Sequence, residues 1–313
     1  MTLASVACLF PGQGSQVVGM GRDLCEAFPA AAVTFEEADD SLGVSLARLC
    51  FEGPSEELAL TEHAQPAILT VSVAAFRVLR DETGLEPAVL AGHSLGEWSA
   101  LVAGGAIAFA DAVRGVRERG RLMQQAVPPG VGAMAAVMGM SSDDVTALCA
   151  RAAEDDVLGP ANWNGAGQTV VAGSAAAVER LVALAPSHGG KAKRLPVSAP
   201  FHCALMAPAA AELACWLADT TLRSPAWPVV TSVEARPVRD GDDVRRLLIA
   251  QVTAPVRWQE TMHATAVHDV GLALEVGPGR VLAGLWRREM PGLRCLGVAG
   301  PADVVAVRQA LED

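Results

Sequence analysis

The positions of hydrophobic residues along the chain predict an α/β protein. Short apolar runs are typical of buried strands, and most are followed by a longer segment with helical spacing of apolar residues. The predicted strands lie at residues 5–10, 88–90, 229–233, 272–276 and 295–298. The predicted helical segments lie at residues 20–51, 67–80, 106–127, 206–216 and 243–251, with another from Arg280. Strands that alternate with helices form a largely parallel sheet covered by helices.

The pattern changes after the hinge-like sequence Pro128-Pro129-Gly130. Strand, helix, strand, helix and strand are predicted in turn at residues 132–140, 141–153, 169–172, 175–185 and 191–197. This order predicts a small ferredoxin-like α+β subdomain, residues 130–198, inserted into a larger α/β-hydrolase-like subdomain. The larger subdomain then comprises residues 1–129 and 199–313 and contains the parallel sheet.

Composition narrows the classes of function. The chain has 313 residues, 51% of them hydrophobic, which is sufficient for one large α/β domain with an insert. Its net charge of −11 argues against a nucleic-acid-binding protein. No apolar stretch of about 20 residues lacks charges or turn formers, so we expect no membrane-spanning helix. The N-terminal residues lack the basic start of a signal peptide and are interpreted as the first strand.

Seven cysteines are scattered along the chain without a C-x-x-C pair. An odd number of scattered cysteines predicts neither a zinc site nor a disulfide framework, so we expect no metal site. We interpret these residues as reduced thiols of a cytoplasmic protein.

Residues 92–96 (GHSLG) fit the pattern G-x-S-x-G, between a predicted strand and an alanine-rich helical stretch. This is the order of a nucleophile elbow, a sharp strand-to-helix turn that exposes a serine hydroxyl. A Cβ at Gly92 or Gly96 would collide with the neighbouring strand or helix, and the strained turn places Ser94 near the positive end of the helix. On its own, the pattern is also compatible with a glycine turn that carries an ordinary serine.

Three further features are candidates for a serine-dependent site, and each has a structural alternative. The glycine-rich loop at residues 11–16 suits oxyanion or phosphate binding through its backbone N–H groups, or forms only a tight turn. His202 lies where the chain leaves the small subdomain, a position that suits a cleft residue or a structural histidine. Arg117 and Arg119 flank the apolar face of their helix, and helical spacing does not choose which of them reaches a cleft.

Four separated segments occur together: FPGQGSQ at residues 10–16, GHSLGEWSAL at 92–101, ERGRLMQQAVP at 118–128 and SAPFHCALM at 198–206. They resemble the malonyl-CoA:acyl carrier protein transacylases and the related acyltransferase domains of polyketide synthases. Three more segments, ANWNGAGQTVVAG, QVTAPVRW and EVGPGRVLAGL, also resemble segments of this family. The resemblance spans nearly the whole chain in the family's order and is therefore far more specific than the serine motif alone.

The resemblance implies a Ser–His pair without a triad acid. Ser94 is implied as the nucleophile, and His202 as the group that takes its proton and later returns one to the leaving thiol. A backbone carbonyl near Gln251 is implied to orient the imidazole, and we identify no compelling aspartate for that role. The backbone N–H groups of Gln13 and Leu95 are implied to form the oxyanion hole.

The resemblance also implies an acyl pocket. Arg119 matches the family arginine that binds the malonyl carboxylate through a two-pronged pair. Phe201 stands at the family's selectivity position, where its ring leaves little room for an α-methyl group, as in polyketide-type members. This favours a free-standing acyltransferase of polyketide synthesis, with fatty-acid synthesis as the other option. Ser232 departs from the family, in which asparagine is common. The other residues implied to line the pocket are Gln13, His93 and Gln251.

The implied reaction transfers a malonyl group from malonyl-CoA to the phosphopantetheine thiol of an acyl carrier protein through a malonyl-serine, without a metal or nucleotide cofactor. Both partners are anionic. We expect Lys191, Lys193 and Arg194 to form a docking patch for the carrier protein, with three solvated charges as the alternative. We also expect a monomer with no nucleic-acid or membrane partner.

Three rival functions give different predictions. An editing hydrolase on the same fold shares Ser94 and His202 but tends to lack a carboxylate-binding arginine. An ordinary α/β-hydrolase esterase needs the order Ser…Asp/Glu…His and an HGGG-type loop, and no HGGG occurs in the sequence. A vestigial interaction module requires decay of the chemical residues, yet Ser94, His202, Arg119 and Gln13 are all present.

Overall fold

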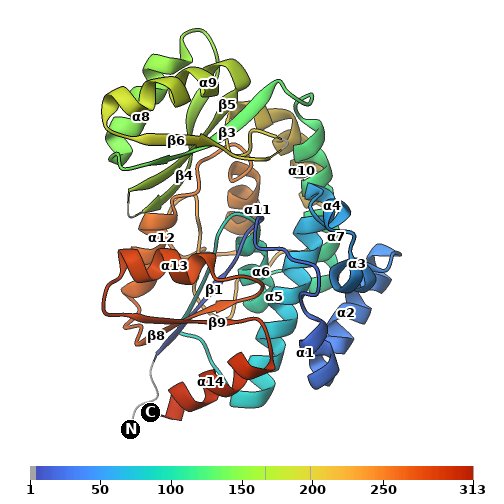
Figure 1. Ribbon diagram of the computed structural model, residues 1–313. Coiled ribbons are helices and arrows are strands. Elements are labelled where there is room, and N and C mark those ends of the chain that lie inside the picture. The colour runs from blue at the N-terminus through green and yellow to red at the C-terminus, as the bar shows by residue number, and fades with distance from the viewer. Residues whose placement is uncertain (1–4, 166, 198, 313) are drawn as a thin grey trace.

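The larger part of the protein is built on a five-stranded sheet whose strand pairs are all parallel (Figure 1). The computed structural model describes residues 5–165, 167–197 and 199–312. The strands occur in the order β7-β2-β1-β8-β9. Their bounds are β1 Val6–Phe10, β2 Val89–Gly92, β7 Val229–Val230, β8 Leu272–Val276 and β9 Arg294–Val298. The predicted α/β fold with a parallel sheet is confirmed.

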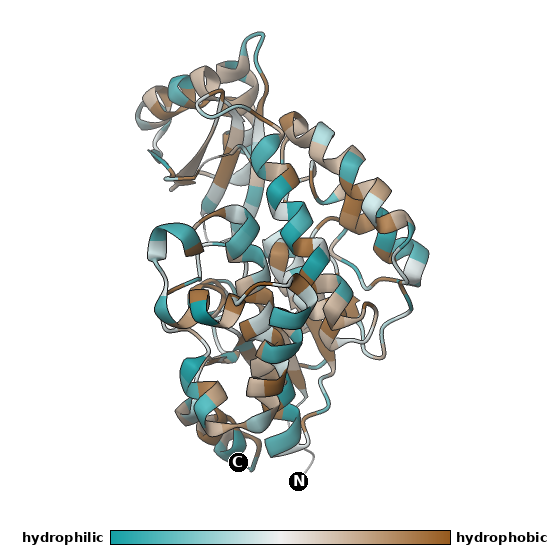
Figure 2. Ribbon diagram, turned by 90° about the vertical axis from the view of Figure 1, so that its right-hand side faces the viewer, coloured by the Kyte–Doolittle hydropathy of each residue, from teal (hydrophilic) through white to brown (hydrophobic). Residues whose placement is uncertain are grey.

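Helices cover this sheet, and in Figure 2 many of them show one hydrophilic and one hydrophobic side. Their bounds are α1 Arg22–Ala27, α2 Pro29–Leu42, α3 Leu46–Glu52, α4 Ser55–Leu58, α5 Thr61–Thr83, α6 Leu95–Ala103, α7 Phe109–Gln125, η2 Ala204–Met206, α10 Ala207–Ala218, α11 Gly241–Ala250, α12 Trp258–Ala266, α13 Val281–Glu289 and α14 Pro301–Glu312. None of the described helices is long and apolar enough to cross a membrane.

Successive side chains of β1 are buried on opposite faces of the sheet. Cys8 and Phe10 belong to the core that includes α5 and α6, whereas Ala7 and Leu9 pack with residues of α12 and α13. Both faces are therefore covered, which explains why β1 is a continuous apolar run rather than an alternating one.

The helical region predicted at residues 20–51 is divided into three helices. Pro29 occupies the first position of α2, where its missing N–H costs no helical hydrogen bond. Gly43 ends the same helix in the left-handed conformation, with φ 65°. Local turn chemistry therefore divides a segment whose apolar spacing is continuous.

The smaller part is a four-stranded antiparallel sheet with the order β4-β5-β3-β6. Its elements are β3 Gly132–Met138, α8 Ser142–Ala153, β4 Leu158–Gly165, β5 Gln168–Ser174, α9 Ala175–Leu184, η1 Ala185–His188 and β6 Lys191–Arg194. Residues of α8 and α9 share one core with one face of the sheet. This βαββαβ order confirms the predicted ferredoxin-like fold. The subdomain boundaries at 129/130 and 198/199 stay a prediction, and Ser198 lies outside the described residues.

Strand β4 is absent from the elements that the sequence predicts. It begins with Leu158-Gly159-Pro160, which is typical of a turn, and its register against β5 shifts between Pro160 and Asn162. Proline is tolerated at this position because β4 is an edge strand. Pairing with β5, rather than local alternation, defines this strand.

The order of the large sheet brings two loops together. Strands β1 and β2 are parallel neighbours, and Phe10 at the end of β1 is paired with Gly92 at the end of β2. The glycine-rich loop after β1 and the turn after β2 therefore leave the sheet side by side at its carboxyl edge, where ligands bind in open α/β sheets.

The turn after β2 needs glycine because backbone segments touch there. A Cβ at Gly92 would lie 1.9 Å from the carbonyl carbon of Gly96, and a Cβ at Gly96 would lie 1.9 Å from the carbonyl oxygen of Phe10. Both neighbours are main-chain atoms, which cannot rotate away as a flexible side chain would. Glycine at both positions is thus a condition for the approach of α6 to the sheet.

We predict that Gly96→Ala lowers the free energy of unfolding by about 3 kcal/mol, because the new methyl group forces α6 away from β1. Gly284→Ala is the matched control, because Gly284 lies within α13 and a Cβ there meets nothing within 4 Å. That substitution should be neutral or stabilise by up to about 1 kcal/mol. Urea unfolding of both variants and the wild type measures the difference, and equal stabilities for the two variants would contradict the packing argument.

Candidate active site

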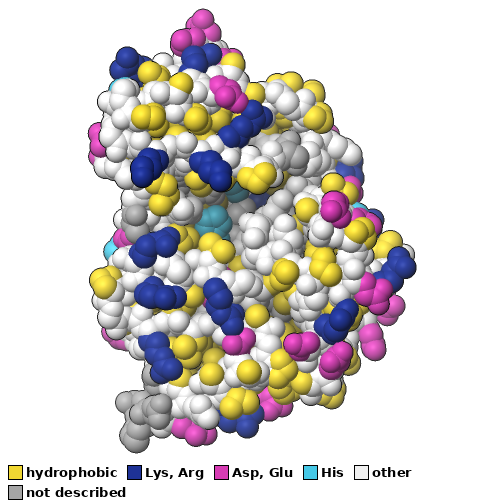
Figure 3. Space-filling view, viewed as in Figure 1, with side chains coloured by type: hydrophobic (Ala, Val, Ile, Leu, Met, Phe, Trp, Pro, Cys, Tyr) yellow, Lys and Arg dark blue, Asp and Glu magenta, His cyan; other side chains and the backbone are white. Residues whose placement is uncertain are grey.

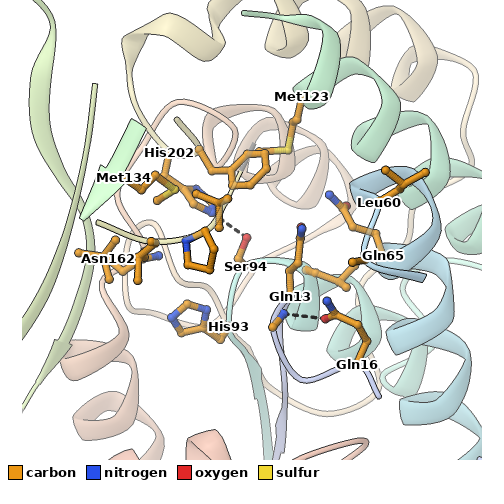
Figure 4. Close-up of a pocket in the computed structure, with 18 of the residues that line it drawn as sticks. Gln13, Gln16, Leu60, Gln65, His93, Ser94, Met123, Met134, Asn162 and His202 are labelled. Carbon is orange, nitrogen blue, oxygen red and sulfur yellow. Dashed lines mark hydrogen bonds between the residues drawn. The ribbon is translucent and has the colours of Figure 1, made fainter. Parts of the chain in front are cut away.

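Ser94 lies in the turn between β2 and α6 in a strained backbone conformation, with φ 52° and ψ −105°. A positive φ is uncommon outside glycine, and the tight packing of the turn holds it in place. The Ser94 Oγ lies 2.7 Å from Nε2 of His202. Figure 4 shows the two side chains pointing toward each other, joined by this hydrogen bond. The turn therefore has the geometry of a nucleophile elbow.

The imidazole of His202 is held from behind by the backbone carbonyl oxygen of Gln251, which lies 2.8 Å from Nδ1. A carbonyl only accepts hydrogen bonds, so Nδ1 carries the hydrogen and Nε2 presents its lone pair to the Ser94 hydroxyl. Burial, reinforced by the positive charge of Arg119, lowers the pKa of His202 to about 3. The imidazole is therefore neutral near pH 7 and able to accept a proton.

Arg119, on α7, is only 1% exposed, so its guanidinium is a buried cation. Its Nη1 donates to Oε1 of Gln65 at 2.8 Å, and its Nη2 donates to Oε1 of Gln251 at 2.9 Å and to Oγ of Ser94 at 3.1 Å. The Nε–H is also buried and has no hydrogen-bond partner among the described residues. Burial lowers the pKa of Arg119 to about 10, so the group stays charged near pH 7. Arg117 instead donates to a backbone carbonyl at the end of α2.

These groups border a cavity of about 600 Å³ between the two parts of the protein. Figure 3 shows the hollow on the surface, with a histidine side chain visible inside it. The small part contributes Met134 and Asn162 to the lining, and Phe201 lies beside His202. His93 connects the two parts, because its Nε2 lies 3.0 Å from Oδ1 of Asn164 on β4. The cavity therefore depends on the relative position of both sheets.

Two backbone segments border the cavity next to Ser94. Leu95 is the first residue of α6, and N–H groups in a first helical turn have no partner within the helix. Gln13 lies in the loop after β1, where the Gly14 N–H donates to Oε1 of Gln16 at 2.8 Å (Figure 4). A Cβ at Gly12 would lie 2.6 Å from the His93 carbonyl oxygen, so this loop packs directly against the elbow.

The structure brings most of the predicted site residues to one place. Gln251 forms hydrogen bonds with three of these residues, namely Arg119, His202 and the backbone carbonyl oxygen of Ser94. The others line the cavity, namely Gln13, His93, Ser94, Leu95, Arg119, Phe201 and His202.

The three basic residues predicted to form one patch are divided between the faces of the small sheet. Lys191 and Lys193 are opposite Met138 and Ala136 in the β3–β6 ladder, so they lie on the same face as the cavity residue Met134. Arg194 lies on the other face and pairs with Glu179 of α9 at 2.6 Å. A single patch of three basic residues is therefore wrong, because neighbouring residues of a strand point in opposite directions.

Sequence reasoning missed several polar residues of the site. Gln65 and Glu97 are both 1% exposed, although each belongs to a helix whose sequence gives no sign of a buried polar group. Asn162 and Asn164 lie on β4, the strand that the sequence did not predict. Their hydrogen-bond partners are distant in the sequence, so only the folded chain shows their positions.

In the described part of the chain, no three His, Cys, Asp or Glu side chains come close enough together to hold a metal ion. The seven cysteines are free thiols, and burial raises the pKa of Cys8, Cys50 and Cys149 above the usual value for a thiol. A raised pKa disfavours the thiolate, so these thiols are poor nucleophiles.

Comparisons with known proteins agree with this geometry. The family of acyl transferase domains matches residues 8–289. The malonyl CoA-acyl carrier protein transacylase of Escherichia coli K12 is 46% identical over 305 residues, which are 97% of this chain and 99% of the relative. The resemblance in the sequence motifs is thereby confirmed.

Solved structures give the same result. The malonyl CoA-acyl carrier protein transacylase of Coxiella burnetii superposes with a TM-score of 0.97 at 40% identity and 99% coverage of both chains. A malonyl-transacylase solved in complex with its type II polyketide acyl-carrier protein superposes with a TM-score of 0.96 at 43% identity, covering 98% of this chain and 100% of that one. The chain therefore belongs to the family of acyl transferase domains that includes the malonyl CoA-acyl carrier protein transacylases, and it is an acyltransferase.

Proposed function

We propose that the protein transfers a malonyl group from malonyl-CoA to the phosphopantetheine thiol of an acyl carrier protein, through a malonyl ester on Ser94. The observation that carries this proposal is the buried guanidinium of Arg119, which lies 3.1 Å from the Ser94 hydroxyl inside the cavity. A buried cation at that distance selects an acyl group with a carboxylate of its own, as malonyl has. The names of the relatives support the same substrate.

In the first step, Ser94 Oγ attacks the thioester carbonyl carbon while Nε2 of His202 takes the hydroxyl proton. The carbonyl oxygen becomes an oxyanion, which the backbone N–H groups of Gln13 and Leu95 stabilise. Collapse of this intermediate breaks the C–S bond. The CoA thiolate leaves and takes the proton from the imidazolium, so His202 is neutral again.

The second step reverses the roles. Nε2 of His202 takes the proton of the phosphopantetheine thiol, and the thiolate attacks the malonyl ester carbonyl. The oxyanion forms against the same two N–H groups, and the C–O bond to Ser94 then breaks. The serine oxygen leaves with the proton from His202, which restores the resting site. No cofactor is required for either step, because serine supplies the covalent chemistry.

Arg119 explains the selection of malonyl over acetyl. Gln65 and Gln251 each accept an N–H from the guanidinium, which fixes its plane, and its buried Nε–H has no partner among the residues that the structure describes. A malonyl carboxylate pairs with donors on this plane, whereas an acetyl group leaves the cation unpaired. Phe201 restricts the space for an α-methyl group, and this discrimination is worth about 1–3 kcal/mol.

A hydrolase that edits stalled acyl groups is the alternative function on this fold, and the carboxylate-binding arginine and the named relatives favour transfer. We propose an acyl carrier protein as acceptor, supported by the relative solved with its carrier protein. The ring at Phe201 favours a polyketide pathway, and the monomeric state and cytoplasmic location stay predictions.

The first prediction of the proposed function concerns the covalent intermediate. Incubation with malonyl-CoA, without carrier protein, should give a stable malonyl adduct in the intact mass of the wild type. Ser94→Ala should give none. Arg119→Ala should form the adduct about 10²-fold more slowly, because it loses a buried charge pair, and Arg119→Lys should also be slower. Release of free CoA without an adduct would favour the hydrolase instead.

The second prediction concerns pH. Because burial and Arg119 hold the pKa of His202 at about 3, the imidazole is neutral at any pH above that value. Inactivation of Ser94 by phenylmethylsulfonyl fluoride should therefore keep a constant rate from pH 8 down to about 5. Arg119→Met removes one cause of the lowered pKa of His202. In this variant the inactivation rate should therefore begin to fall at a higher pH than in the wild type. If the inactivation rate of the wild type fell with a midpoint near pH 6.5, the ordinary pKa of histidine, this account would be contradicted.

The third prediction concerns docking. We propose that Lys191 and Lys193, on the cavity face of β6, attract the anionic carrier protein. Their double substitution by alanine should raise the KM for the carrier protein about 5-fold at low salt and leave kcat unchanged. Arg194→Ala is the matched control, because Arg194 pairs with Glu179 on the opposite face. An unchanged KM in the double variant, or an equal rise in the control, would refute this docking site.

A further inference from the structure

Glu97 is a buried carboxylate beside the active site that the two chemical steps do not use. It lies in the first turn of α6, three residues after Ser94, and is 1% exposed. Its Oε2 accepts from the backbone N–H of Ser232 at 2.8 Å, from the Ser232 hydroxyl at 2.7 Å and from Nε2 of Gln251 at 2.9 Å. Burial raises the pKa of Glu97, and the hydrogen bonds from Ser232 and Gln251 together with the charge of Arg119 act against this rise. Three donors on one oxygen favour the ionised form, which is the better acceptor.

The Gln251 amide connects this carboxylate to the arginine. Its Oε1 accepts from Arg119, and its Nε2 donates to Glu97. If the amide were flipped, its N–H groups would face the guanidinium and its oxygen would face the carboxylate, so like groups would meet on both sides. The acid on one side and the cation on the other therefore fix the amide, and the amide fixes one edge of the guanidinium.

The Gln251 amide also keeps the Glu97 carboxylate apart from the Arg119 guanidinium. Among the described residues, the hydrogen-bond acceptors of Arg119 are Gln65, Ser94 and Gln251 and no carboxylate, although the charges of Glu97 and Arg119 influence each other. A carboxylate in direct contact would occupy N–H groups and compete with a substrate carboxylate. A carboxylate one amide away offsets the cost of burying the cation and leaves those N–H groups to the substrate.

We propose that Glu97 is a positioning residue for acyl-group selection: through Gln251 it holds the Arg119 guanidinium ionised and correctly oriented for the carboxylate of the acyl group. The inference rests on the proposed malonyl transfer and names the residue that supports its selectivity. Ser232 belongs to the same hydrogen-bond network, because its N–H and its hydroxyl both donate to Oε2 of Glu97. The residue that departs from the family pattern therefore lies behind the arginine and not in the cavity lining.

Glu97→Gln tests the proposal, because it removes the charge and preserves the shape. Acylation of Ser94 is followed by intact mass with malonyl-CoA and, separately, with acetyl-CoA. The acylation rate with malonyl-CoA should fall about 10-fold or more, whereas the rate with acetyl-CoA, which has no carboxylate for Arg119, should stay within about 2-fold. The malonyl-to-acetyl ratio is the readout, because a general loss of structure lowers both rates together.

Two comparisons make the test specific. Glu275→Gln is the matched control, because Glu275 is also a fully buried carboxylate but accepts from the N–H groups of Leu282 and Ala283 at the start of α13. It should leave the ratio unchanged. In an Arg119→Ala background, Glu97→Gln should produce no further change in the ratio, because residues that act through one another are not additive.

An equal fall with both acyl groups, or an additive effect in the Arg119→Ala background, would overturn the proposal. If Glu97→Gln does not fold, Ser232→Ala replaces it, since this variant keeps the charge and removes one donor. Its ratio should fall about 3-fold, and an unchanged ratio would overturn the proposal in the same way. A wild type that forms no malonyl adduct would instead refute the proposed function, so the two failures are distinguishable.

Discussion

The active site depends on a positive charge that is almost completely removed from water next to a nucleophilic hydroxyl. The guanidinium of Arg119 is 1% exposed and lies 3.1 Å from the Ser94 Oγ. Burial of an unpaired cation is costly, so its neighbours must be acceptors, and Gln65 and Gln251 supply amide oxygens. Burial of His202 lowers its pKa, and the same charge lowers it further, which keeps the base neutral. The cation that selects a carboxylate therefore also contributes to the protonation state of the base.

The fold provides this arrangement through contacts between main-chain atoms. Pairing of Phe10 with Gly92 brings the ends of β1 and β2 to the same edge, and the glycines at 92 and 96 let α6 approach that edge. The strained φ of Ser94 follows from this packing. Because these contacts involve the backbone, the positions of the serine and of the neighbouring N–H groups are insensitive to the side chains that line the cavity.

Much of this fold could be predicted from local patterns. Strand β8 occurs with the predicted bounds, and the turn after β2 is recognisable because glycine has a steric role there. The edge strand β4 was missed because Gly159 and Pro160 are typical of turns, and only pairing with β5 makes them a strand. The division of the basic residues of β6 between two faces, by contrast, follows from strand alternation and was within reach of the sequence.

The site was harder to predict than the fold, because its contacts join distant residues. Helical spacing left Arg117 and Arg119 equivalent, and in the sequence only the resemblance distinguished them. In the structure, Arg119 is buried and Arg117 is partly exposed. Glu97 resembles an ordinary acid in the first turn of a helix. Its partner Gln251 is 154 positions away, so no local pattern shows that the carboxylate is buried.

Gln251 serves the two functions of the site through different parts of the residue. Its main-chain carbonyl orients His202, and its side-chain amide orients Arg119. Any amino acid at this position supplies the carbonyl, but only glutamine supplies an amide of this length with its oxygen toward the guanidinium. The hydrogen bond that orients the base is therefore independent of the Gln251 side chain, whereas the orientation of the guanidinium is not. A side-chain change at this position can alter acyl selection while the main-chain hydrogen bond to His202 is kept.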